Sequence, residues 1–268
     1  MRGLRIVLPP LVVLAGVLVV WWIVSLRVLA PEQRFLLPPP QDVVRVGLLD
    51  SANRAEALAG LWSTSAVALT GLAFAAAVGI AFAVLMSQAT WLERSLYPYA
   101  VALQTIPILA MVPLIGFWFG FDFRSRVLVC VLIAVFPILT NTLFGIHSVE
   151  IGLRELFALQ GAGRWSRLVR LEMPAALPAL MAGLRISAGL SVIGAIVGDF
   201  FFRQGQPGIG RLIDVYRGRL QSEQLITAVL LSSLLGLVVF WSFGLLTRRV
   251  VGSWHESGRR QPTGKGER

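Results

Sequence analysis

The sequence predicts an all-α membrane protein with six transmembrane helices. Of its 268 residues, 56% are hydrophobic and only 14% are charged, and the mean hydropathy is +0.75. A soluble domain carries roughly 25% charged residues, so the composition excludes a water-soluble protein. Long uncharged runs alternate with charged segments, and each run is long enough to cross about 30 Å of hydrocarbon at about 1.5 Å per residue.

Six uncharged runs define the expected spans. The first follows Arg2 and Arg5, as in a signal peptide. It is longer than the apolar core of a signal peptide, and Ala30-Pro31 is a poor cleavage site, so we expect a retained helix. Six crossings place both termini on one side of the membrane. The spans are expected at residues 6–26, 57–92, 95–121, 127–149, 177–198 and 224–247.

Two of the spans contain prolines that are expected to interrupt the helix. The third span contains Pro107 and Pro113, and the fourth contains Pro137. Proline removes a backbone donor and clashes with the preceding turn. It is tolerated in a membrane helix because neighbouring groups or water satisfy the freed carbonyls. Because such broken helices often line a transport pathway, these two spans are the candidates for one.

Polar side chains near these prolines and at the end of the fifth span are candidate pathway residues. Polar groups inside a bilayer are costly unless they are used or paired, and hydrogen bonds between helices explain them equally well. For the aspartate, which precedes an aromatic string, a position at the lipid headgroups is the competing interpretation. The candidates are Gln104, Thr105, Thr140, Asn141 and Asp199.

The basic residues predict that both termini are cytoplasmic. The net charge is +10, and Lys265 is the only lysine. Cytoplasmic flanks of membrane proteins carry excess arginine and lysine and contact anionic lipid. Residues 251–268 are basic and polar and are expected to form a disordered cytoplasmic tail. Nucleic acid is not an expected partner, because the arginines do not form a patch interleaved with aromatics.

The longest polar interruption on the expected cytoplasmic side is residues 148–176. We expect a helix at 151–160, a turn at Gly161-Ala162-Gly163, and a second helix from Arg164 until Pro174 ends it. Arginines share one face of the second helix, and apolar side chains share another. Such a hairpin can lie on lipid headgroups or enter a groove of a partner protein, and composition favours neither.

This loop resembles the "EAA" motif of ABC importer permeases, in which Glu-Ala-Ala, three residues, Gly, nine residues and Ile-x-Leu-Pro follow in order. Glu155-Leu156-Phe157 takes the opening triplet, Gly161 the glycine and Met173-Pro174 the closing pair, without a gap. Leu156 and Phe157 replace the two alanines, so the groove of the partner is expected to differ in shape. The strings GAGRW, MPAALP and GLRISAGL are similar to permeases of nitrate, sulfonate and taurine importers.

The resemblance implies the type I ABC importer permease fold over residues 57–250, after an N-terminal span and external loop at 1–56. It implies that 148–176 is a coupling loop that docks into separate ATPase subunits. A second permease copy, an external substrate-binding protein and a bacterial plasma membrane location are implied as well. The coupling residues implied by the motif are Glu155, Gly161, Ala162, Gly163, Arg164, Trp165 and Pro174.

A catalytic or metal-binding role is not expected. The sequence lacks G-x-x-x-x-G-K-[ST], so ATP and magnesium are expected to bind to the partner ATPase and not to this chain. Cys130, His147 and His255 are isolated, which argues against a metal site. The spans are expected to hold no buried acid, which argues against an ion-driven carrier. An intramembrane enzyme would need paired aspartates or a Ser–His couple, and neither is evident.

The sequence does not decide between two classes of transported solute. The resemblance implies nitrate, sulfonate or taurine, and the alternative is an aromatic vitamin precursor such as a pyrimidine or a flavin. The aromatic residues around Asp199 weakly favour a ring-bearing solute. On the fifth span, Arg185 is expected either to reach a lipid phosphate or to pair with Glu172.

Overall fold

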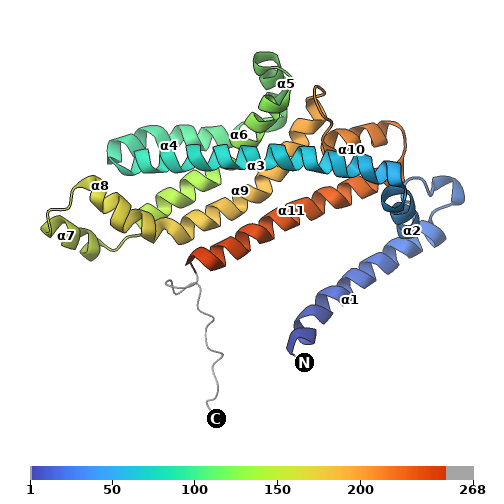
Figure 1. The fold of residues 1–268 in the computed structure, drawn as a ribbon, viewed down its shortest axis with the longest axis horizontal. Helices are drawn as coiled ribbons and strands as arrows, with labels where there is room; N and C mark the ends of the chain where they lie inside the picture. The colour runs from blue at the N-terminus through green and yellow to red at the C-terminus, as the bar shows by residue number, and fades with distance from the viewer. Residues whose placement is uncertain (1, 252–268) are drawn as a thin grey trace, which may run out of the picture. The chain divides into compact units, whose positions relative to one another are not determined.

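The computed structural model describes residues 2–251, with side chains described from residue 8 to residue 250 (Figure 1). Five helices in this range are long and apolar enough to cross a membrane, and the number is six if the bent pair of α4 and α5 counts as one span. The expected tail at 251–268 lies outside the described residues beyond Val251. The helices are α1 (Arg2–Ile23), α2 (Pro40–Val44), α3 (Ser51–Ser87), α4 (Thr90–Thr105), α5 (Ile108–Phe119), α6 (Phe123–His147), α7 (Ile151–Leu159), α8 (Arg164–Arg167), α9 (Met173–Phe201), α10 (Ile209–Gly218) and α11 (Ser222–Val251).

The third span is broken at Pro107, as the sequence predicts, but the expected interruption at Pro113 is wrong because α5 runs through it. α4 and α5 meet at an angle of 98°, and Pro107 is the residue that precedes α5. Ile106 and Pro107 both have extended backbone, as expected for a residue before proline and for a proline outside a helix. The break therefore follows from the local chemistry of Pro107.

The expected interruptions at Pro137 and Pro174 are wrong. α6 runs through Pro137 without a break. Proline removes only one helical hydrogen bond there, and packing against α9 holds the helix on both sides. The loop helix does not end at Pro174 either. A wide π-helical turn at Leu168–Glu172 leads directly into α9. Pro174 lies in the first turn of α9, where its missing N–H is not needed.

The chain forms two compact units. The first combines residues 1–63 with 206–233, and the second combines 64–205 with 234–268. In the first unit, the hydroxyl of Tyr216 on α10 donates a 2.7 Å hydrogen bond to the Glu56 carboxylate. Burial, and then this hydrogen bond, raises the pKa of Tyr216. The hydrogen bond ties α10 to the beginning of α3.

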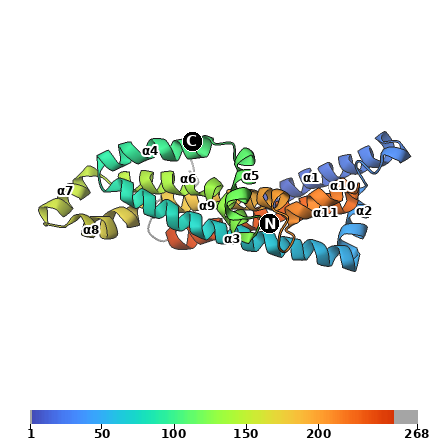
Figure 2. The same ribbon diagram turned by 90° about the horizontal axis from the view of Figure 1, so that it is seen from above.

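The core of the second unit is the pair formed by α6 and α9, which lie side by side (Figure 2). Small residues let the two backbones approach closely. A side chain at Gly183 would place its Cβ 2.7 Å from the carbonyl oxygen of Pro137. The hydroxyl of Ser187 donates a 2.6 Å hydrogen bond to the carbonyl of Ala134 across the same interface. Packing and these polar contacts hold the pair together.

The contact at Gly183 can be tested by adding a single methyl group. Gly183→Ala is expected to lower stability by about 1–3 kcal/mol, because the methyl collides with backbone that cannot move aside. Gly189→Ala on the same helix is the control, since nothing lies within 4 Å of its added Cβ. Thermal unfolding in detergent measures both. Equal melting temperatures for the two variants would contradict the close approach of α6 and α9.

Candidate functional site

The loop between α6 and α9 folds as an elbow, which we define as residues 151–172. The N–H of Gly161 donates to the carbonyl of Ala158, and the N–H of Ala162 donates to that of Phe157, each at 3.0 Å. This pair of hydrogen bonds is the Schellman motif, which needs a left-handed residue at the glycine position. Gly161 has φ +69°. The glycine of the motif is thus required by the conformation that ends α7.

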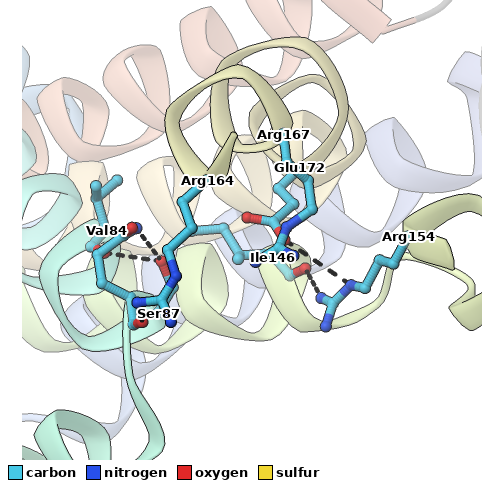
Figure 3. Close-up of polar contacts among 8 residues, drawn as sticks. Val84, Ser87, Ile146, Arg154, Arg164, Arg167 and Glu172 are labelled. Carbon is cyan, nitrogen blue, oxygen red and sulfur yellow. Dashed lines mark hydrogen bonds and ion pairs between the residues drawn. The ribbon is translucent and has the colours of Figure 1, made fainter. Parts of the chain in front are cut away.

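A buried carboxylate holds the elbow to the membrane helices (Figure 3). Glu172 is only 5% exposed, and the Nε of Arg167 donates to its Oε1 at 3.0 Å. The Nε of Arg154, on α7, lies 3.9 Å from the same oxygen. Arg154 also donates from Nη2 to the carbonyl of Ile146 at 2.8 Å, in the last turn of α6. One carboxylate therefore connects α7, α8 and the beginning of α9, and Arg154 extends the connection to α6.

A second contact connects the elbow to the end of α3. The guanidinium of Arg164 donates to the carbonyl of Gln88 at 3.3 Å, just beyond the helix. The amide of Gln88 donates to the carbonyl of Val84 at 3.0 Å, and the hydroxyl of Ser87 donates to the same oxygen at 2.7 Å. Arginine near a helix C-terminus stabilises its last carbonyls. Figure 3 shows both contact groups, so the elbow is tied to the ends of three spans.

The outer surface of the elbow carries several large apolar side chains. Leu156 is 48% exposed, Leu159 87% and Trp165 72%, whereas Leu168 is buried. Within the second unit, α7 and α8 lie at one end of the α6–α9 pair and α5 at the other (Figure 1). Exposed apolar side chains gathered on one segment mark an interaction surface. Two arginines of the expected charged face, Arg164 and Arg167, make hydrogen bonds to protein groups.

The other motif residues of the elbow fall in different environments. Glu155 and Gly163 are exposed, Ala162 is partly buried, and Pro174 is partly buried at the start of α9.

Sequence reasoning missed the partners of Glu172. Of the two alternatives for Arg185, pairing with Glu172 is wrong, because Arg185 lies 13 residues further along the same helix, about 20 Å away at about 1.5 Å per residue.

The pathway candidates are not gathered in one place. Gln104 lines a cavity of about 280 Å³ at the bend between α4 and α5. The hydroxyl of Thr105 donates to the carbonyl of Ala102 at 2.8 Å. Thr140 and Asn141 donate to carbonyls one turn back, at 2.9 and 2.8 Å. Their role as pathway residues stays a prediction.

Asp199 is fully buried, so its expected position at the lipid headgroups is wrong. Its Oδ1 lies 3.0 Å from the Nη1 of Arg126 on α6, and its Oδ2 accepts a 2.5 Å hydrogen bond from the hydroxyl of Thr64 on α3. The expectation of no buried acid in the spans is wrong for the same reason. α6 begins at Phe123, four residues earlier than expected, which brings Arg126 into the helix interface.

Comparison with known proteins decides the family. Residues 73–252 match the model of the binding-protein-dependent transport system inner membrane component family. The chain belongs to this family. Among its relatives is the formylaminopyrimidine transport permease protein ThiX of Halalkalibacterium halodurans, 35% identical over 225 residues, covering 83% of this chain and 87% of ThiX. The riboflavin transport system permease protein RibX of Chloroflexus aurantiacus is 40% identical over 167 residues, which cover 62% of this chain and 61% of RibX. The taurine transport system permease protein TauC of Escherichia coli is 29% identical, covering 90% of this chain and 88% of TauC.

Solved structures confirm the fold class. A chain of the MetNI methionine ABC transporter, in an inward-facing conformation, aligns with a TM-score of 0.67 at 18% identity, covering 75% of this chain and 99% of that one. A chain of a bacterial alginate importer aligns with a TM-score of 0.62 at 15% identity, covering 94% and 100%. The protein is an ABC importer permease subunit with the type I fold, a multi-pass component of the inner membrane.

Removing the charge of Glu172 tests how the elbow is held. Glu172→Gln is expected to lower stability by about 2 kcal/mol, because two arginines lose a buried partner that is only partly replaced by water. Glu155→Gln is the control, since that side chain is exposed on the same loop. Thermal unfolding and limited proteolysis within residues 151–172 measure the effect. Equal cleavage of the two variants would show that Glu172 does not hold the elbow to the membrane helices.

The buried ion pair of Asp199 and Arg126, at the other end of α6 and α9, can be tested separately. Asp199→Asn removes the carboxylate charge that pairs with Arg126 in the buried interface and is expected to lower stability by about 3 kcal/mol. The double variant Asp199→Asn/Arg126→Gln removes both charges and should recover part of the loss. Thermal unfolding compares the three proteins. A double variant no more stable than the single one would show that the charge pairing is not what Asp199 contributes.

Proposed function

We propose that the elbow couples ATP hydrolysis by a separate ATPase to alternating access of the membrane helices. One observation carries this proposal: the elbow is tied through Glu172, Arg154 and Arg164 to three spans, while large apolar side chains are exposed on its outer surface. An apolar hairpin of this kind fits a groove on a partner protein. The tied side would transmit a displacement of the exposed side to the helices.

The transmission would be mechanical. Closure of the ATPase would move the elbow, and the contacts of Arg154 with Glu172 and with the α6 carbonyl would carry this motion into α6 and α9. The Gly161 turn fixes the angle between α7 and α8 in the unbound chain. No step of this mechanism needs a nucleotide on the chain itself. ATP and magnesium would bind to the ATPase.

The surrounding assembly follows from the same proposal. The elbow would face the cytoplasm, and both termini with it. The permease would function as a pair, with a second copy of this chain as the simplest partner, two ATPase subunits and an external binding protein. The family description, which specifies binding-protein-dependent transport and an inner membrane component, supports this arrangement.

The transported solute is proposed to be a small organic molecule, and a heteroaromatic vitamin precursor is favoured over a sulfonate, taurine or nitrate. RibX and ThiX are 40% and 35% identical, while the E. coli aliphatic sulfonate permease SsuC and TauC are 30% and 29% identical. The cavity at the α4–α5 bend is lined by apolar side chains and Gln104. Such a lining suits a planar ring with one or two polar edges.

The docking role of the elbow predicts a separation of function from folding. Leu159→Ser should leave the melting temperature unchanged, because the side chain is 87% exposed. It should weaken binding of the ATPase about tenfold, since an apolar contact is lost from the interface. Leu220→Ser is the control, an exposed leucine outside the elbow. Copurification and ATP-dependent uptake in liposomes measure both variants. Normal ATPase binding by Leu159→Ser would contradict the docking surface.

The solute class is tested by direct uptake in the same liposomes. The reconstituted importer with its binding protein is given labelled pyrimidine, flavin, taurine and nitrate, one at a time. ATP-dependent uptake of the ring compounds alone is the expected result. ATP-dependent uptake of taurine or nitrate alone would exclude the aromatic class while leaving the coupling role intact.

A further inference from the structure

A basic pocket of about 310 Å³ lies between α9 and the last turns of α11, within the second unit. Its lining combines arginines from two helices with an aromatic and an aliphatic side chain. The lining residues are Arg185, Trp241, Gly244, Leu245 and Arg248. None of them belongs to the elbow or to the cavity at the α4–α5 bend.

Arg185 is held in place on one side and unsatisfied on the other. Its guanidinium carbon lies 4.0 Å from the centre of the Phe240 ring, a cation–π contact. The absence of a side chain at Gly244 leaves room for it, because a Cβ there would lie 3.5 Å from the guanidinium. Its Nε is buried and has no hydrogen-bond partner. Within the described part of the chain, neither Arg185 nor Arg248 forms an ion pair.

Two arginines without a carboxylate partner create a site of unbalanced positive charge. A buried charge and a buried N–H donor are costly unless they are paired and hydrogen-bonded. The cation–π contact addresses the face of the guanidinium and leaves its N–H groups free. A phosphate would satisfy them, because its oxygens match the forked donors of arginine.

The neighbouring side chains decide between a lipid and a free anion. Trp241 and Leu245 are each 60% exposed. Arg248 directly follows the uncharged run of the last span, which is where hydrocarbon gives way to lipid headgroups. A soluble anion would make no use of the exposed apolar side chains, whereas a phospholipid would cover them with its acyl chains. We propose that this pocket binds the phosphate of an anionic membrane phospholipid.

The test compares phosphatidylglycerol with phosphatidylcholine in nanodiscs that hold the full chain. Phosphatidylglycerol is expected to raise the melting temperature of the wild type, and native mass spectrometry should detect the bound lipid. Arg185→Gln and Arg248→Gln should lose the shift and bind the lipid about tenfold more weakly. Arg248 is exposed, so that variant is expected to fold even if Arg185→Gln does not.

Arg249→Gln is the matched control, because it removes the same charge one residue further along without touching the pocket. The proposal predicts that this variant keeps the full shift. An equal loss in Arg249→Gln, or no preference of the wild type for phosphatidylglycerol, would overturn the site. Glycerol phosphate added to the phosphatidylcholine nanodiscs separates the two anion sources. If it reproduced the whole shift, the pocket would be a free-anion site and the lipid assignment would be wrong.

Discussion

The carboxylate of Glu172 is the contact on which the elbow depends. It lies where α8 passes into α9, and it binds arginines from both sides of the hairpin. Because the group is buried, each arginine would leave an uncompensated charge if it moved away. The turn at Gly161 determines how the hairpin closes, and Glu172 determines where it is held. The exposed surface of the elbow is free to serve a partner because the inner surface is fully engaged.

The α6–α9 pair is held by ionic contacts at both of its ends. At one end Glu172 joins the elbow, and at the other Asp199 binds Arg126 and Thr64. Between these ends the helices approach closely at small residues, including Gly183. Packed interiors transmit strain because they contain little free space. A displacement imposed at the elbow would therefore reach the far end of the pair without being absorbed between them.

The parts of the fold that depend on local chemistry could be predicted from the sequence. Whether a segment enters a membrane depends on its own composition, so hydropathy predicted the spans. The turn at Gly161 was predictable because a left-handed residue that ends a helix is usually glycine. The interruptions at Pro137 and Pro174 could not be judged locally, because a membrane helix tolerates proline when its neighbours hold it. The burial of Asp199 depends on the start of α6, which a hydropathy boundary sets only to within a few residues. The partners of Glu172 depend on the register across a turn, which spacing alone does not fix.

The most direct test of the account is whether the elbow and α6 move as one body. Spin labels at Gln160→Cys, at the end of α7, and Phe144→Cys on α6 occupy exposed positions outside the named docking side chains, and the native Cys130 is buried. Their distance is measured by pulsed electron paramagnetic resonance in the assembled importer, without nucleotide and with ATP bound. The account predicts one narrow distance that is the same in both states. A distance that shifts or broadens on ATP binding would show that the elbow moves independently of the helices and would contradict the coupling mechanism.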